Sequence, residues 1–197
     1  MNKPTPQEIK TVMLSLGMKV FTAPFDMTLG GIRTVDNKAN TFNDWLFMLW
    51  HDEKGVLNGT IEKGTTDAGL YYRTKPMTPK GTCIIAHTMQ YRGSFTYMKV
   101  GGHRGQEAFR QTKGLNYFLD NNKDQYLDFV NLITDQIYNT NGHDMGTVGN
   151  LVNNWSAGCW GSTNAIMDKF YLLAQLQMKH GHGAGFSYAM LHENDFK

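Results

Sequence analysis

The stretch SAGCWGSTNAIMDKFYLLAQLQMKHGHGAGFSYAMLHE, residues 156–193, contains the clearest pattern of secondary structure in the chain. The small residues at its start indicate a tight turn, and Ser162 or Thr163 can cap a helix that follows. Apolar residues then recur at helical spacing as far as Gly181, a typical helix end. These apolar positions are Ile166, Met167, Phe170, Leu173, Ala174 and Leu176. We therefore expect a turn, one long helix over about 163–180, and a closing strand in FSYAMLHE.

The segment before this turn places a histidine upstream of the cysteine. In LITDQIYNTNGHD, residues 132–144, helix or strand character is ambiguous up to Gln136. Residues 137–142 then indicate a strand that delivers His143 at its end. The predicted order is therefore strand, His143, loop, Cys159, helix, strand.

The preceding region, from Met18 to about Phe118, is predicted to be rich in β-structure. Its branched and aromatic segments are separated by clusters of Gly, Asn, Asp and Pro. The segments are MKVFT, LGGIRTV, DWLFMLW, GTCIIAH, SFTYMKV and EAFRQ. This spacing predicts a mainly β fold with helices, of the α+β class, built on an antiparallel sheet, a sandwich or a partly closed barrel.

The N-terminal residues 1–17 predict a helix ahead of a single domain over residues 18–197. Thr5 can cap this helix, Pro6 suits its first position, and Glu8 completes a capping box. An apolar face follows at Ile9, Val12, Met13 and Leu16. Gly17 is a plausible end, and this helix is expected to serve packing rather than chemistry.

Composition and charge limit the classes of function. The chain has 197 residues, of which 41% are hydrophobic, and a formal net charge of +2. It shows no Lys/Arg stripe, so binding to nucleic acid through phosphate contacts is not expected. No run of about 18 apolar residues predicts a membrane span, and the N-terminus lacks the apolar run of a signal peptide. The two cysteines make no disulfide framework. We expect synthesis in a reducing cytoplasm, with no membrane insertion.

Cys159 is the residue on which a catalytic interpretation depends. A thiol becomes nucleophilic beside a histidine or a helix N-terminus, and the sequence offers His143 and the predicted helix. Gly158 allows a tight turn, and successive N–H groups at Gly158 and Cys159 are a candidate oxyanion hole. Ser156 is a candidate partner of His143 or of the loop. The competing interpretation is that Cys159 is a small buried apolar residue without chemistry.

These residues resemble a known family. His143, a gap of twelve residues and Ser156-Ala157-Gly158-Cys159 resemble the L,D-transpeptidase signature, which is a histidine, a similar gap and Ser/Thr-His-Gly-Cys. The resemblance covers residues 137–191 and implies a β-sandwich catalytic domain. The whole chain also resembles phage and bacterial proteins of the Bacteroidetes group, without an assigned activity, at GIRT, QYRGSF, GGHRGQEAFRQ and WSAGC.

The resemblance implies cysteine-dependent acyl transfer or hydrolysis on peptidoglycan stem peptides. Cys159 would attack the carbonyl of a diamino-acid residue, with His143 as general base and then acid. The lack of a signal peptide favours a phage lysis or virion-associated hydrolase that reaches the cell wall after release. Ala157 departs from the motif histidine, and Trp160 from the usual branched residue. These departures keep a second interpretation open, a non-catalytic cell-wall-binding or virion structural module on the same fold.

Four further residues are expected to bind substrate. Tyr91, Arg92 and His103 lie in glycine-flanked polar segments, where an Arg fork suits a carboxylate, and Trp160 follows the nucleophile. No cofactor and no metal is expected, because His180-Gly181-His182 lacks further ligands at suitable spacing. The segment 120–128, DNNKDQYLD, has the spacing of a calcium loop but lacks its glycine and its final Glu, so we expect a polar turn. The oligomeric state is left open.

Overall fold

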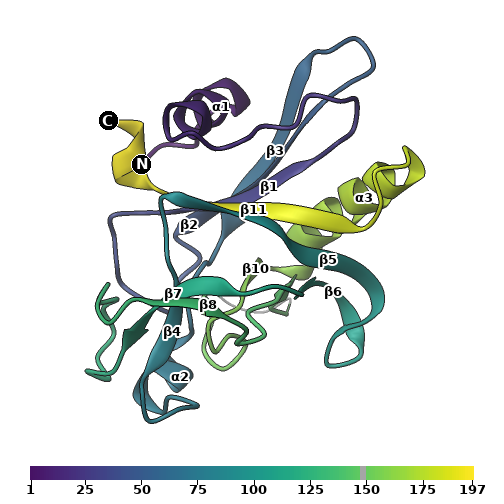
Figure 1. Ribbon diagram of the computed structural model, residues 1–197. Coiled ribbons are helices and arrows are strands. Elements are labelled where there is room, and N and C mark those ends of the chain that lie inside the picture. Colours follow the sequence, from purple (N-terminus) through teal and green to yellow (C-terminus); the bar gives the residue numbers. More distant parts are fainter. Residues whose placement is uncertain (147–149) are drawn as a thin grey trace.

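Two β-sheets and three α-helices make up the residues that the structure describes, 1–146 and 150–197 (Figure 1). The structure is a computed structural model. It confirms a mainly β fold with helices in an α+β arrangement, and its two sheets agree broadly with a sandwich. None of the described helices is long and apolar enough to cross a membrane.

The larger sheet has eight strands in the order β10-β9-β6-β5-β11-β1-β2-β3. Two of its neighbouring pairs, β1 with β11 and β9 with β10, are parallel, and the others are antiparallel. The strands are β1 (Thr28–Arg33), β2 (Asp44–His51), β3 (Leu57–Gly64), β5 (Met89–His103), β6 (Gln106–Gln111), β9 (Gly142–Asp144), β10 (Trp160–Ser162) and β11 (Gly185–His192).

The two edges of this sheet meet. Thr65, directly after β3, forms an isolated bridge with Gly161 of β10. The Thr65 N–H donates to the Gly161 carbonyl at 2.8 Å, and the Gly161 N–H returns a bond of 3.0 Å. The short strand β10 is thus held on both sides, by β9 and by the start of the next segment after β3. This bracing fixes the backbone that directly follows Cys159.

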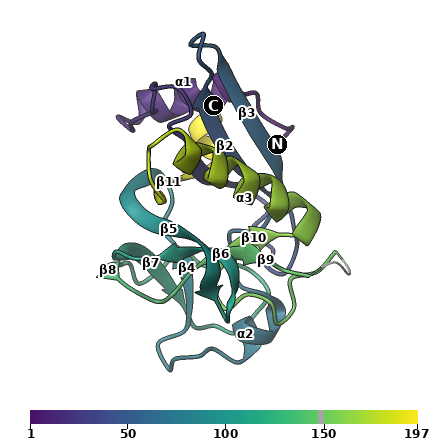
Figure 2. The same ribbon diagram turned by 90° about the vertical axis from the view of Figure 1, so that its right-hand side faces the viewer.

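The helices α1 (Pro6–Ser15) and α3 (Asn164–Lys179) cover opposite faces of the sheet (Figures 1 and 2). In β2, successive residues alternate between the two apolar clusters, as strand geometry requires. Phe47 packs in the cluster of α1, which includes Ile9, whereas Met48 packs in that of α3, which includes Phe170. The predicted capping box of α1 is confirmed, since Thr5 and Glu8 bond reciprocally.

The smaller sheet has the order β4-β7-β8 and lies with the short helix α2 at the end of the molecule away from α1 (Figure 1). Its strands are β4 (Thr82–Ile85), β7 (Leu115–Asp120) and β8 (Ile133–Gln136), and α2 spans Leu70–Thr74. A 3-10 helix, Glu193–Phe196, ends the chain beside the N-terminus, where the Met1 amino group pairs with Glu193.

Arg73 of α2 holds the loop that follows β7. Its Nη1 lies 2.7 Å from Asp120 Oδ2, and its Nη2 lies 3.7 Å from Asp124 Oδ1 and also donates to the Tyr126 carbonyl. Arg73 and Asp120 are both buried. The segment 120–128, with the spacing of a calcium loop, is therefore a polar loop whose oxygens converge on a guanidinium.

Replacing Arg73 should strongly destabilise the fold. In Arg73→Met the Asp120 carboxylate stays buried without its partner, which typically costs about 3–5 kcal/mol. The matched control is Lys169→Met, which removes the more exposed pair with Glu62 and should cost about 0–1 kcal/mol. Urea denaturation of both variants measures the difference, and equal stabilities would contradict the role assigned to Arg73.

Three local expectations are wrong. MKVFT, residues 18–22, forms no strand. The strand predicted over 137–142 is displaced, because β8 ends at Gln136 and the chain enters a strand again only at Gly142. The long helix is confirmed as α3, but it does not directly follow the cysteine, since β10 lies between them.

Candidate active site

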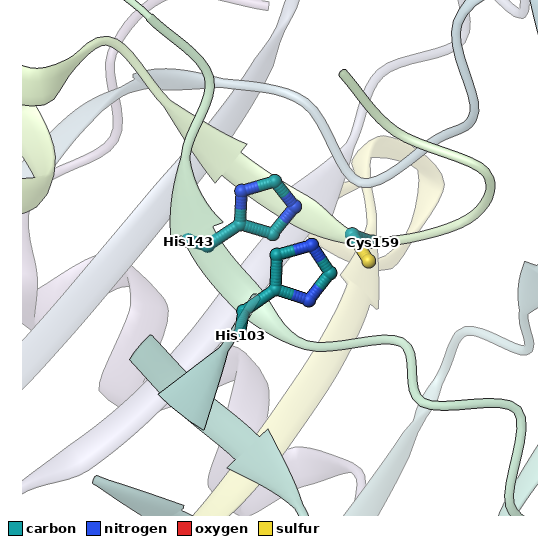
Figure 3. A group of neighbouring side chains, drawn as sticks. All are labelled: His103, His143 and Cys159. Carbon is teal, nitrogen blue, oxygen red and sulfur yellow. The ribbon is translucent and has the colours of Figure 1, made fainter. Parts of the chain in front are cut away.

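His143 and Cys159 are brought together by two neighbouring parallel strands. His143 lies in β9 opposite Gly161 of β10, and Cys159 directly precedes β10. The ladder between these strands therefore sets the separation of the two side chains. Together with His103, they offer ligand atoms that all lie within 4.8 Å of one another. Figure 3 shows both imidazole rings directed toward the cysteine.

The hydrogen bonds of His143 determine which of its nitrogens can accept a proton. Its Nδ1 lies 2.6 Å from the Asp144 carbonyl oxygen. A carbonyl only accepts, so Nδ1 carries the hydrogen and Nε2 presents a lone pair. Nε2 is buried and has no hydrogen-bond partner among the described residues. Burial, and next the neighbouring His103, lower the pKa of His143 to about 4. His143 is therefore a neutral base at neutral pH.

Cys159 is a neutral thiol in the resting site. Its Sγ donates to the Asn139 carbonyl at 3.6 Å, and only 7% of the residue is exposed. Burial raises the pKa of Cys159 to about 11, and the Asn141 backbone and Arg104 oppose this only in part. The sequence predicted that a helix N-terminus would favour the thiolate. That expectation is wrong, because α3 begins at Asn164, beyond β10.

Ser156 and Gly158 shape the turn that carries the thiol. The Ser156 hydroxyl donates to the Cys159 carbonyl at 2.7 Å and accepts the Gly158 N–H at 3.1 Å. Ser156 thus contacts the loop and not His143. Gly158 has φ of +133°, and a Cβ there would lie 2.5 Å from Cys83 Sγ. Since its N–H already bonds Ser156, Gly158 does not supply the oxyanion-hole donor that the sequence suggested.

His103 joins the site from a distant part of the sequence. It ends β5, at the hairpin that leads to β6, and its ring stacks on His143 with centroids 4.2 Å apart and an interplanar angle of 6°. Its Nδ1 lies 3.1 Å from the Asn141 side-chain nitrogen. His103 therefore lies beside the candidate base, a position that adds to the substrate-binding role expected from the sequence.

A cavity of about 320 Å³ opens onto Cys159 between the larger sheet and the smaller one. Arg104 is the one Lys, Arg, Asp or Glu side chain among the described residues that line it. Arg104 was not predicted as a site residue, although it directly follows His103 in the segment GGHRGQEAFRQ. The lining residues are Tyr72, Met77, Thr78, Gly81, Thr82, Cys83, His103, Arg104, Leu119, Tyr138, Asn139, Thr140, Trp155, Ala157 and Cys159.

Tyr91, Arg92 and Trp160 do not line this cavity, contrary to expectation. The Tyr91 hydroxyl is buried and donates to the Ala86 carbonyl at 2.7 Å. Arg92 lies on the surface with its guanidinium over the Phe21 ring. Trp160 is completely buried in the core, where it stacks on Tyr188 at a centroid distance of 4.9 Å. Tyr91 and Trp160 therefore contribute to packing, and Arg92 lies on the surface outside this cavity.

The three clustered side chains could also suggest a metal centre, since Cys and His are zinc ligands. Among the described residues, no other group of three His, Cys, Asp or Glu side chains lies close enough together to hold a metal ion. A ligating His103 would need a lone pair on the nitrogen that faces the thiol. The Asn141 side-chain nitrogen, 3.1 Å from Nδ1 of this ring, favours the opposite tautomer. The donor set thus fits a metal poorly in its present hydrogen-bond arrangement.

Comparisons with known proteins give no assignment. No family model, no curated protein and no solved structure matches the chain. The resemblance to L,D-transpeptidases therefore stays a prediction that depends on the motif around His143 and Cys159.

Proposed function

We propose that the protein is a cysteine-dependent enzyme that performs acyl transfer or hydrolysis on peptidoglycan stem peptides. One observation carries this proposal. A buried thiol at the wall of a cavity lies within 4.8 Å of a ring nitrogen of His143, whose Nε2 is buried and has no hydrogen-bond partner among the described residues. A nucleophile, a base and a group that orients the base are the elements of nucleophilic catalysis.

The proposed reaction uses His143 first as base and then as acid. Because the resting thiol is neutral, the Cys159 proton moves to His143 Nε2 as sulfur attacks the substrate carbonyl. The Asp144 carbonyl holds the Nδ1–H and supports the imidazolium that forms. Collapse of the tetrahedral intermediate breaks the C–N bond, and His143 gives its proton to the leaving amine. An amine or water then attacks the thioester carbonyl and gives its proton to His143, and as the C–S bond breaks the Cys159 sulfur takes that proton back.

The residues that line the cavity favour a substrate that combines a carboxylate with less polar groups. Arg104 contributes a charged side chain to its described lining, and a guanidinium binds carboxylates bidentately. Tyr72, Tyr138 and Trp155 supply aromatic surface around it. Stem peptides carry free carboxylates and short side chains. Action on the cell wall after release from the cytoplasm, or from a virion, is part of the same proposal.

A second candidate is a non-catalytic cell-wall-binding or virion module on the same fold. The burial of Cys159 and its raised pKa favour it, because reactive cysteines are usually exposed and acidic. Thiol reactivity separates the two candidates. In an enzyme, iodoacetamide should label Cys159 faster than Cys83, whose pKa burial raises to about 12. Equal, very slow labelling of both cysteines would favour the binding module.

The decisive test is incubation of the protein with purified muropeptides. We expect loss of the terminal D-amino acid, or exchange of it for an added D-amino acid, and a transient acyl adduct on Cys159. Product masses distinguish hydrolysis from transfer. Unchanged muropeptides, with no adduct on Cys159 and none after addition of a β-lactam, would refute the proposed substrate class.

A further inference from the structure

We propose that His103 is a second catalytic residue, whose Nε2–H donates a hydrogen bond to the oxyanion of the tetrahedral intermediate. This inference rests on the acyl chemistry proposed for Cys159 but not on the identity of the substrate. His103 lines the cavity beside Cys159, and its ring points toward the thiol (Figure 3). It differs in role from His143, which exchanges protons.

The backbone of Gln111 fixes the orientation of the Asn141 amide. The Gln111 N–H donates to Asn141 Oδ1 at 2.9 Å, so that atom must be the carbonyl oxygen. The other end of the amide, the NH2 group, therefore faces His103 Nδ1 at 3.1 Å. An NH2 group only donates, so His103 Nδ1 must be the acceptor. The hydrogen of the neutral ring then lies on Nε2.

The two stacked histidines consequently present opposite groups to the thiol. His143 carries its hydrogen on Nδ1 and offers a lone pair at Nε2, whereas His103 accepts at Nδ1 and offers an N–H at Nε2. Burial, and next the charge of Arg104, lower the pKa of His103, which keeps its ring neutral. A neutral ring avoids a second positive charge next to His143 once His143 has taken the proton.

A donor from His103 would replace one that the turn does not supply. The Gly158 N–H is engaged by Ser156, so the turn before Cys159 offers one donor fewer than its sequence suggested. When sulfur bonds to the carbonyl carbon, the C=O electron pair moves to oxygen and the thiol proton moves to His143. His103 donates only a hydrogen bond and keeps its proton throughout. Collapse restores the C=O bond as the leaving group departs.

The test compares two reactions of the same thiol. Acylation by p-nitrophenyl acetate forms an oxyanion, whereas alkylation by iodoacetamide does not. In His103→Phe, which keeps an aromatic ring over His143, acylation of Cys159 should fall about 10²–10³-fold, as for loss of one oxyanion-hole donor. Alkylation should change only a few fold. Intact-protein mass spectrometry measures both rates, and His103→Gln, which retains an N–H donor, should recover part of the loss.

Each alternative outcome overturns the proposal. Equal losses in both reactions would mean that His103 acts on the thiol or on the fold. Unchanged acylation would mean that it takes no part. If wild-type Cys159 is not acylated at all, the covalent route itself fails, whereas a muropeptide that is not cleaved would leave this inference standing.

The tautomers provide an independent check, because ¹⁵N shifts of the imidazoles should show Nε2–H for His103 and Nδ1–H for His143. An Nδ1–H ring at His103 would remove the proposed donor, and a cobalt–thiolate absorption band on adding Co²⁺ would indicate a metal centre instead.

Discussion

Cys159→Ser is expected to abolish muropeptide turnover while leaving the fold intact. The substitution keeps the volume of a small buried side chain and can keep the hydrogen bond to the Asn139 carbonyl. A serine hydroxyl is much harder to ionise than a thiol, and His143 is a weak base. Turnover should therefore fall by several orders of magnitude. Product masses and the free energy of unfolding measure the two effects separately.

Cys83→Ser is the matched control for this prediction. Cys83 lines the same cavity, and its thiol donates to the Ala157 carbonyl at 3.6 Å, a bond that a hydroxyl can replace. The substitution is chemically identical but removes no nucleophile, so turnover should persist. Full activity in Cys159→Ser, or a complete loss in Cys83→Ser alone, would move the nucleophile away from Cys159.

His143→Gln should reduce turnover about 10²–10⁴-fold, because it removes the general base and general acid. The pH dependence gives a second signature of this residue. The neutral, proton-accepting form of His143 exists above its pKa of about 4 and is lost as the pH falls through that value. Wild-type kcat/KM should therefore stay high from neutral pH down to about 5 and decline near pH 4. A histidine of ordinary pKa would give the decline near 6.5.

His180→Gln controls for the loss of a histidine as such. His180 lies on the surface after α3, where its ring stacks on Phe25. Its replacement should leave the rate and the pH profile unchanged. Circular dichroism at each pH shows whether the fold persists. An acidic limb that remains near pH 4 in His143→Gln, with unreduced kcat/KM, would remove His143 from the mechanism.

Elements that depend on neighbours in sequence were predictable. The capping box of Thr5 and Glu8 and the periodic face of α3 are local patterns, and the structure contains both. The pairing of His143 with Cys159 also follows from one short motif. In each case the signal lies within a few turns or within one loop of the chain.

Features that depend on distant pairing were not predictable. The strand β10 has three residues and exists because β9 and Thr65 bond its two sides. When these two partners are not known, the sequence after Cys159 resembles the start of a helix. His103 was expected in the substrate site, but its place beside His143 depends on the long β5–β6 hairpin, which brings it from 40 positions earlier in the chain. No local pattern indicates that its ring would stack on the candidate base.

The misplacement of Tyr91 and Arg92 has a simple geometric cause. Consecutive residues of a strand point to opposite faces, so the two side chains of this pair cannot share a cleft. In β5, Tyr91 points into the core and Arg92 points to solvent. The segment around Tyr91 and Arg92 is polar and contains a glycine, but the strand divides its side chains between two surfaces.

The guanidinium of Arg73 has a consequence for the conditions in which the protein can work. A calcium ion bound in the loop 120–128 would exchange with the solvent, and its occupancy would follow the calcium concentration of that solvent. Arg73 is part of the chain, so neither dilution nor a chelator can remove its charge from the loop. Leu119, next to Asp120, lines the cavity, as does Tyr72 beside Arg73. This wall of the cavity should therefore keep its shape whether calcium is scarce or abundant.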